Sequence, residues 1–135
     1  MSPPYTNRQL ADILFDSIET NDFVRLGEVY TPETIIWHNA DQAEKLLADY
    51  VTILQQFRQC ARDWKYTTVR HIDIEDGFVR QMLVQGHTRG GHVFGGATCL
   101  VCTTKNGKIT RIDEYFDTAG TTALFEEVAH QNSER

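Results

Sequence analysis

The hydrophobic positions in the first part of the chain follow the spacing of helices. One helix face is formed by Leu10, Ile13, Leu14 and Ile18. Thr6 precedes this run, and Gln9 stands three positions after Thr6, which is the spacing of a capping box. We therefore expect a helix to begin at Thr6. Asp22 can cap a second, short helix that ends before Pro32.

The next segment changes to a strand pattern and then returns to a helical one. Residues 34–39 are rich in β-branched and aromatic side chains, which favours a short strand. Because side chains alternate along a strand, Trp37 and Asn39 share one face. Asp41 with Glu44 predicts the start of a third helix, whose broad apolar face is formed by Leu46, Leu47, Tyr50, Val51, Leu54 and Phe57.

Beyond Trp64 the pattern is that of strands joined by hairpins. Four strands are expected, over residues 65–74, 78–88, 93–104 and 108–117. The turn Asn106-Gly107 precedes the last of them, and a final helix follows Gly120. Helices gathered on one side of an antiparallel sheet predict an α+β domain.

The last strand carries charge on a segment that otherwise has the pattern of core. Alternation places Ile112, Glu114 and Phe116 on one face and Arg111, Asp113, Tyr115 and Asp117 on the other. If the first set points inward, the Glu114 carboxylate lies between two large apolar groups. Such a carboxylate must be paired, be protonated or face a wet cavity. The alternative is an edge strand with ordinary surface charges.

Composition narrows the class of protein. The 135 residues fit one domain over residues 1–135, with flexible ends at about 1–5 and 131–135. A net charge of −6 without a cluster of Lys and Arg argues against nucleic acid or an anionic membrane as partner. No apolar run is long enough to span a bilayer, no signal peptide is recognisable, and the three cysteines form no disulfide framework. We therefore expect a cytoplasmic protein.

Two further patterns carry little chemistry. His87 and His92 could face each other across a hairpin, but two imidazoles without a third ligand make a poor metal site. Cys99 and Cys102 point to opposite faces of a strand, so they do not form a redox pair. The glycines between residues 86 and 96 fit neither a dinucleotide fingerprint nor a phosphate loop. We expect no metal and no cofactor.

Four segments together resemble the nuclear transport factor 2-like superfamily: Asn21-Asp22-Phe23, Ile35-Ile36-Trp37-His38-Asn39, Asn106-Gly107-Lys108-Ile109 and Glu114-Tyr115-Phe116-Asp117. Within it the chain is most similar to the SnoaL-like group, which is similar to polyketide cyclases, limonene epoxide hydrolases and steroid Δ-isomerases. The resemblance implies a cone, in which a curved antiparallel sheet is wrapped by the N-terminal helices. It also implies an apolar pocket at one end and a homodimer formed through the sheet.

The functional positions of these relatives are only partly retained. Glu114 stands where the epoxide hydrolases have an Asp that activates water, but the earlier strand reads Arg80-Gln81-Met82 and lacks the partner acid. Asn39 stands at the base Asp of the steroid isomerases, and Leu100 stands near their oxyanion-binding acid. For the cyclases, the resemblance implies acid–base catalysis by His87 or Glu114.

We therefore expect a cofactor-independent enzyme of the cyclase, isomerase or hydrolase type. It would act by acid–base chemistry on a small apolar or polycyclic molecule, with Glu114 as acid or base and with Asn39 and His87 orienting the substrate or a water. The candidate substrate-binding residues are Trp37, Tyr50, Phe57, Met82, Leu100 and Phe116. The alternative is a ligand-binding or protein-interaction module of the same fold without catalysis. The missing acids favour this alternative, and the retained Glu114 argues against it.

Overall fold

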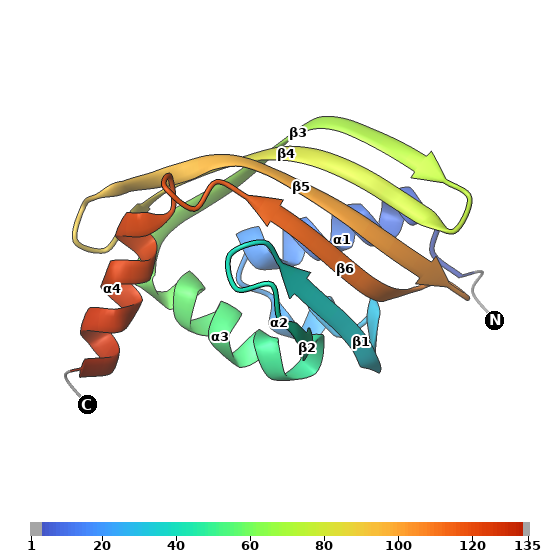
Figure 1. Cartoon of the computed structure of the whole chain (residues 1–135), viewed down its shortest axis with the longest axis horizontal. Coiled ribbons are helices and arrows are strands. Elements are labelled where there is room, and N and C mark those ends of the chain that lie inside the picture. Colours follow the sequence, from blue (N-terminus) through green and yellow to red (C-terminus); the bar gives the residue numbers. More distant parts are fainter. Residues whose placement is uncertain (1–3, 134–135) are drawn as a thin grey trace.

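A curved sheet wraps around the helices in the computed structural model of the chain, which describes residues 4–133. The helices are α1 (Asn7–Glu19), α2 (Phe23–Leu26), α3 (Leu47–Cys60) and α4 (Thr122–Ser133). The strands are β1 (Tyr30–His38), β2 (Glu44–Leu46), β3 (Ala61–Ile74), β4 (Gly77–Thr88), β5 (Val93–Lys105) and β6 (Lys108–Phe116). Helices α1, α2 and α3 lie under the concave side of the sheet, and α4 stands at one end (Figure 1). The expected α+β class with N-terminal helices inside a curved sheet is confirmed.

Local signals in the sequence fix the first two helices as expected. The Thr6 side chain accepts a hydrogen bond from the Gln9 backbone, and the Gln9 side chain accepts one from the Thr6 backbone, which completes the capping box of α1. Asp22 accepts a hydrogen bond from the Arg25 N–H and caps α2. These caps supply partners for backbone N–H groups that have none within the helix.

The start of the third helix differs from the prediction. Asp41 caps a turn instead of a helix, because its carboxylate accepts a hydrogen bond from the Ala43 N–H and pairs with Lys45. Gln42 takes a left-handed backbone conformation with φ of 53°, which reverses the chain. Residues 44–46 then pair antiparallel with β1 as the short strand β2, and α3 begins only at Leu47.

The sheet is mixed, whereas the sequence predicted an antiparallel one. Its order is β2-β1-β6-β5-β4-β3, in which β3 to β6 are antiparallel neighbours and β1 runs parallel to β6. A parallel pair needs a long crossover connection, and here residues 39–107 lie between the two strands. The β1–β6 register places His38 directly beside Glu114.

The core fills the space between the sheet and the helices. Its larger cluster joins the inner face of α1 to the sheet, through residues such as Leu10, Leu14, Phe78 and Ile112. Arg80 also points into this layer and is almost completely buried. Its guanidinium donates to the Nδ1 of His71 at 3.1 Å and pairs at 2.9 Å with Asp12, whose side chain is exposed, so the charge is compensated from the edge of the layer.

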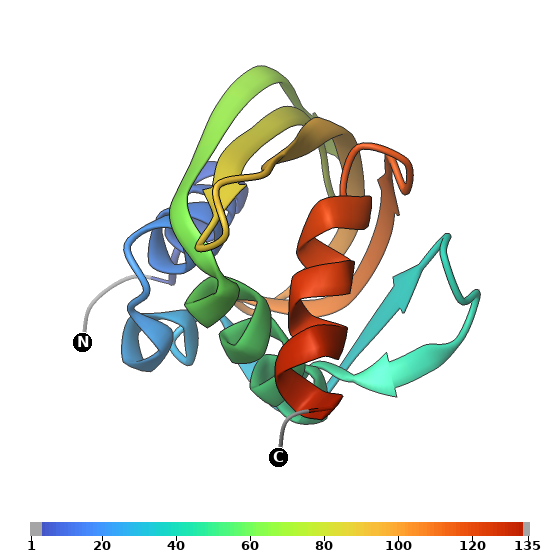
Figure 2. The ribbon, with the colours of Figure 1, turned by 90° about the vertical axis from the view of Figure 1, so that its left-hand side faces the viewer.

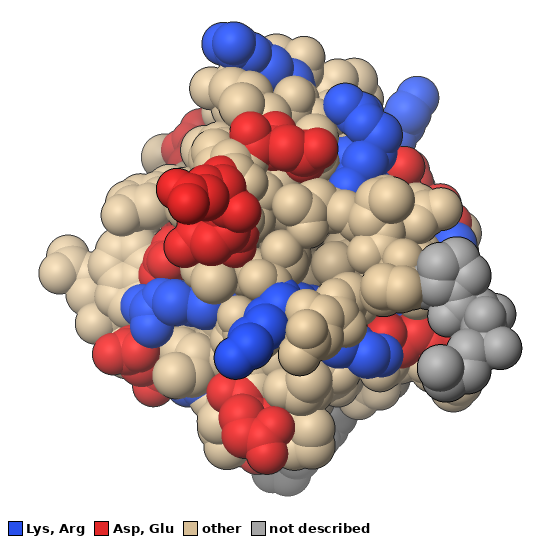
Figure 3. Space-filling view, turned by 90° about the vertical axis from the view of Figure 1, so that its right-hand side faces the viewer, with Lys and Arg blue, Asp and Glu red and all other residues tan. Residues whose placement is uncertain are grey.

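The outside of the molecule carries mixed charge. Lys and Arg side chains alternate with Asp and Glu on the face drawn in Figure 3, so no basic patch forms there. The outer face of the sheet is more apolar, with Val69, Leu83 and Tyr115 exposed. Among the described residues, no helix has the length and apolar character needed to cross a bilayer.

Candidate active site

A cavity lies between the concave face of the sheet and helices α1, α3 and α4. Figure 2 shows the sheet curving around the interior with α4 across the near end. Most of its wall is apolar and comes from Leu14, Phe15, Ile18, Leu26, Ile36, Leu47, Leu54, Phe57, Val84, Leu100, Ile112, Phe116, Leu124 and Phe125. The remaining lining residues have polar groups and are His38, Tyr50, Trp64, Tyr66, Thr98, Glu114 and Thr121. A mostly apolar cavity with a few convergent polar groups is typical of a small-molecule site.

Helix α3 forms one wall through its helical periodicity. Leu47, Tyr50, Leu54 and Phe57 recur every three or four residues, so they project from one face of α3 into the cavity. Phe57 meets Phe125 of α4 edge to face, with ring centroids 4.8 Å apart. Helix α4 is therefore held across the end of the cavity by aromatic packing.

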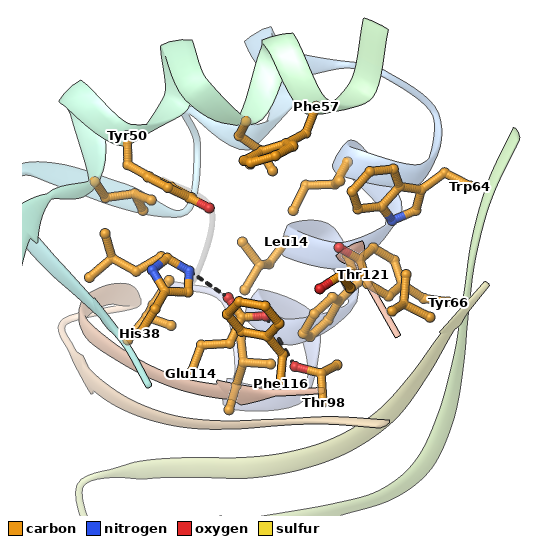
Figure 4. Close-up of a pocket in the computed structure, with 18 of the residues that line it drawn as sticks. Leu14, His38, Tyr50, Phe57, Trp64, Tyr66, Thr98, Glu114, Phe116 and Thr121 are labelled. Carbon is orange, nitrogen blue, oxygen red and sulfur yellow. Dashed lines mark hydrogen bonds and ion pairs between the residues drawn. The ribbon is translucent and has the colours of Figure 1, made fainter. Parts of the chain in front are cut away.

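The central polar feature is a close pair of His38 and Glu114. The Nε2 of His38 lies 2.9 Å from the Oε1 of Glu114 (Figure 4). The hydroxyl of Thr98 donates to the other carboxylate oxygen at 3.1 Å. His38 is 6% exposed, and the side chain of Glu114 is 24% exposed. The carboxylate is thus held at both oxygens while it remains accessible from the cavity.

Glu114 has spare capacity to accept hydrogen bonds. An ionised carboxylate has about four lone-pair sites on its two oxygens, and His38 and Thr98 use two of them. The free positions face a cavity whose walls are mainly hydrocarbon. The carboxylate can therefore accept a proton from a bound molecule without first losing either protein partner.

Tyr50 lies beside this pair and keeps its proton. Its ring centroid is 4.7 Å from that of His38, and its hydroxyl points into the cavity (Figure 4). Burial raises the pKa of the Tyr50 hydroxyl, and the nearby Glu114 charge raises it further. Tyr50 is therefore a neutral hydrogen-bond donor at physiological pH.

A second polar group lies across the cavity. Trp64 and Tyr66 project from β3 on the side opposite His38 (Figure 4). Burial raises the pKa of the Tyr66 hydroxyl most strongly and Glu114 adds to this rise, whereas the neighbouring Trp64 indole opposes it. Among the described residues, the buried Nε1 of Trp64 has no partner with hydrogen-bond geometry, although it lies near enough to Tyr66 to affect that pKa.

The cavity contains most of the predicted site residues. Glu114 lines it together with four of the candidate substrate-binding residues, Tyr50, Phe57, Leu100 and Phe116. Of the two possibilities left open for the last strand, the structure has the face of Ile112 and Glu114 inward, since Ile112 is buried and Tyr115 is exposed.

Two residues of the first strand lie elsewhere than expected. The Asn39 side chain does not line the cavity, because both of its polar atoms bind the backbone of Phe116. Trp37 points to the outer face, where it packs on Tyr115 with ring centroids 5.2 Å apart. The physical reason is the parallel pairing of β1 with β6, which sets Thr34, Ile36 and His38 as the inward positions.

His87 and Met82 are also absent from the cavity wall. His87 is 42% exposed at its side chain and pairs with Asp63 on the neighbouring strand at 3.0 Å. Met82 is buried in the core cluster beneath α1. The structure therefore gives neither side chain contact with a molecule in this cavity.

The polar cavity residues that the sequence interpretation missed include His38, Thr98, Trp64 and Tyr66. The alternation of Ile36 with His38 was a usable signal for His38, but the two faces of that strand were assigned the other way round. Thr98 carried no signal of its own, because its contact with Glu114 depends on the pairing of β5 with β6. No cluster of three or more His, Cys, Asp or Glu residues suited to a metal ion occurs within residues 4–133.

Comparison with known proteins gives matches only at the level of structure. No family model and no curated protein matches the sequence. IdmH from Streptomyces antibioticus, provisionally described as a polyketide cyclase, is similar with a TM-score of 0.78 and 13% identity, over 90% of this chain and 99% of that one. A SnoaL-like protein from Jannaschia sp. CCS1, also provisionally described as a polyketide cyclase, gives 0.76 and 15%, over 92% and 94%.

A protein of unknown function from Burkholderia pseudomallei, described as similar to nuclear transport factor 2, has a TM-score of 0.74 and 14% identity, over 87% of this chain and 95% of that one. The TM-scores show that the fold is shared. Because the sequence identities are low, the chemistry has to be argued from the cavity itself.

Proposed function

We propose that this chain, which has the fold of the nuclear transport factor 2-like superfamily, is a cofactor-independent enzyme that moves a proton on a small aromatic or polycyclic ketone. The observation that carries the proposal is the close pair of His38 and Glu114, whose Nε2 and Oε1 atoms lie 2.9 Å apart in a mostly apolar cavity. Acid–base catalysis needs a proton acceptor within reach of the substrate and a donor for the oxygen on which charge develops. Glu114 and Tyr50 meet these two needs.

Glu114 acts as the base in this proposal. Its carboxylate removes a proton from a carbon next to a carbonyl group, so that the C–H bond breaks and the electron pair moves to the carbonyl oxygen as an enolate. His38 and Thr98 keep the carboxylate oriented during this step, because each binds one of its oxygens. Preorganised partners of this kind remove the need to reorient the carboxylate as the reaction proceeds.

Tyr50 stabilises the enolate. Its hydroxyl keeps its proton at neutral pH and points into the cavity, so it can donate to the oxygen that becomes negative. The enolate then takes back the proton from Glu114 at another carbon, which is an isomerisation. Alternatively its carbon attacks a second carbonyl, which closes a ring, and the alkoxide formed from that carbonyl takes the proton from Glu114. Both outcomes use the same two residues, and the fold-level likeness to proteins described as polyketide cyclases favours ring closure.

Proton exchange on a simple ketone tests the proposal without knowledge of the natural substrate. 2-Tetralone, a bicyclic ketone with acidic C–H groups, is incubated with the protein in D₂O, and loss of the C–H signal is followed by NMR. We expect wild-type protein to accelerate exchange and Glu114→Gln to reduce the acceleration by a factor of about 10² to 10⁴, which is the usual contribution of a general base.

Asp113→Asn is the matched control for this experiment. Asp113 is the next residue on β6 but points to the outer face, where it pairs with Arg111. This variant should exchange deuterium at the wild-type rate. Equal rates for wild-type and Glu114→Gln proteins would refute the proposed base.

A non-catalytic binding protein is the second candidate. It is favoured by the single carboxylate among the residues that line the cavity, since the related chemistry often uses two acids. Binding of 2-tetralone with no acceleration of exchange by the wild-type protein would support this candidate over the enzyme.

We also propose that the protein forms a homodimer through the outer face of its sheet. Val69, Leu83 and Tyr115 are exposed there and, with Ala97 and Cys99, line a shallow groove. Apolar surface of this kind is often covered by a partner. Light scattering after size-exclusion chromatography should give twice the chain mass, and Leu83→Lys should give the monomer mass.

A further inference from the structure

The cavity wall contains a buried hydrogen-bond donor that the described residues leave without a partner. Among the polar groups of the wall, the hydroxyl of Thr98 shares its proton between Glu114 and the Tyr115 carbonyl, and that of Thr121 shares its proton between the Asp117 and Thr118 carbonyls. His38 is paired with Glu114. Within residues 4–133 the buried Nε1 of Trp64 has no acceptor with hydrogen-bond geometry, and the hydroxyls of Tyr50 and Tyr66 are two further donors in the wall.

These three donors are divided between two sides of the cavity. Tyr50 lies next to His38 and Glu114, whereas Trp64 and Tyr66 lie opposite them, beyond Leu14 and Phe57 (Figure 4). The indole nitrogen of Trp64 points towards Tyr66 (Figure 4). A molecule that reaches Glu114 and fills the cavity therefore ends beside Trp64 and Tyr66.

The Trp64–Tyr66 pair presents hydrogen-bond donors to the cavity. An indole N–H can only donate, and the Tyr66 hydroxyl, which burial keeps protonated, can donate as well as accept. Leaving a buried donor without an acceptor is costly, so a fold that retains one at a cavity wall gains stability when a ligand supplies the acceptor. A carbonyl oxygen, with two lone pairs and no proton, suits such a site.

Charge limits the ligand further. The cavity contains the Glu114 carboxylate and the chain has a net charge of −6, so a second carboxylate would be repelled. The walls around the two polar sides include Phe57, Phe116 and Phe125, which favour a flat aromatic body. These features exclude a charged acid and favour a neutral ketone.

We propose that Trp64 and Tyr66 form a specificity site that binds a carbonyl oxygen at the end of the substrate remote from the carbon on which Glu114 acts. The substrate class is then a neutral, planar aromatic compound with carbonyl oxygens at opposite ends. This inference rests on the proposed function, because it defines what the same cavity holds during the reaction. It concerns binding, so it is tested apart from catalysis.

A pair of ligands that differ only in their carbonyl groups provides the test. 9,10-Anthraquinone has carbonyl oxygens on opposite edges of a flat ring system, and anthracene has the same rings without them. Equilibrium dialysis with absorbance detection gives the dissociation constant of each. Wild-type protein should bind the quinone more tightly, and Tyr66→Phe and Trp64→Phe should each narrow this preference by a factor of about 3 to 10, the value of one neutral hydrogen bond.

Trp37→Phe is the matched control. It also removes one indole N–H, but from the outer face of the sheet, where Trp37 packs on Tyr115. It should leave the preference unchanged, and because the chain has two tryptophans it leaves Trp64 as the only one, so that quenching of its fluorescence reports a ligand in the cavity. Tyr66→Phe changes no ring and provides the second variant if Trp64→Phe fails to fold.

The outcomes separate this inference from the proposed function. Any one of three results would overturn the specificity site. Both cavity variants could keep the full preference for the quinone, the wild-type protein could bind the two ligands equally, or the quinone could fail to bind. Loss of the preference in Tyr66→Phe together with unchanged deuterium exchange in Glu114→Gln would keep the specificity site and reject the base.

Discussion

The side chain of Asn39 and the backbone of Phe116 form a closed pair of hydrogen bonds. The amide nitrogen of Asn39 donates to the Phe116 carbonyl at 3.1 Å, and its oxygen accepts from the Phe116 N–H at 3.1 Å. The backbone N–H of Asn39 also donates to the Glu114 carbonyl at 3.1 Å. Asn39 therefore extends the pairing of β1 and β6 by one step beyond His38, and it fixes the strand ends that carry the proposed catalytic pair.

We predict that Asn39→Ala lowers the free energy of unfolding by about 1–3 kcal/mol, because both polar groups of Phe116 lose their partner in a partly buried place. Asn39→Asp should also destabilise, since a carboxylate cannot donate to the Phe116 carbonyl. Urea denaturation measures both effects. Asn132→Ala, at an exposed position of α4, serves as the control and should change stability by less than about 0.5 kcal/mol.

Thr98 should act on catalysis through Glu114. Thr98→Val keeps the shape of the side chain but removes the donor to the carboxylate, so we expect the exchange of 2-tetralone to slow by about tenfold, the value of a hydrogen bond to a charged group. Thr98→Ser restores a hydroxyl and should recover most of the rate. A rate that falls equally in both variants would assign Thr98 to packing instead of positioning.

Stability should fall at alkaline pH because of the two cavity tyrosines. Burial, with a smaller contribution from Glu114, raises the folded-state pKa of Tyr50 and Tyr66 above the ordinary value of 10.0. Above pH 10 the unfolded chain therefore loses these protons while the folded chain keeps them, and stability decreases with rising pH by about 1.4 kcal/mol per pH unit for each tyrosine.

The alkaline slope is measured by urea denaturation at several pH values between about 9 and 11, which spans the ordinary pKa of tyrosine. Tyr66→Phe should have a shallower slope than the wild-type protein, whatever its stability at neutral pH. Identical slopes would show that the Tyr66 hydroxyl ionises in the folded protein as easily as in the unfolded one.

Gly77 should tolerate no side chain. A Cβ atom at this position would lie 1.8 Å from the Cys102 carbonyl oxygen, because the backbones of β4 and β5 are paired here. We expect Gly77→Ala to destabilise the protein by about 3 kcal/mol or to prevent folding. Gly90→Ala is the comparison, since a Cβ there would meet its nearest neighbour at an ordinary 3.5 Å. Thermal unfolding should distinguish the two variants clearly.

The sequence was informative where one residue decides the outcome locally. The capping box at Thr6 and the cap at Asp22 both depend on residues a few positions apart, and the structure has both. The prediction of helix from Asp41 onwards was wrong, because the same Asp side chain can cap a turn, and the left-handed conformation of Gln42 decided between the two.

The site itself depended on contacts that a single sequence does not specify. Strand alternation has two possible phases, and the choice that placed Trp37 and Asn39 together inverted the faces of β1 and hid His38. The phase is set by the parallel pairing of β1 with β6, which joins residues far apart in the chain.

The neighbouring positions of His38 and Glu114 in the β1–β6 register link the site to the order of folding. Strands β3 to β6 can pair as successive hairpins, whereas β1 must wait for β6, the last strand of the chain. Contacts between distant segments form late because closing a long loop costs entropy. The cavity thus lacks the pair of Glu114, the proposed proton acceptor, and His38 until the sheet is complete. Deuterium exchange on 2-tetralone during refolding would then report the final step of assembly, after the hairpins that circular dichroism detects have formed.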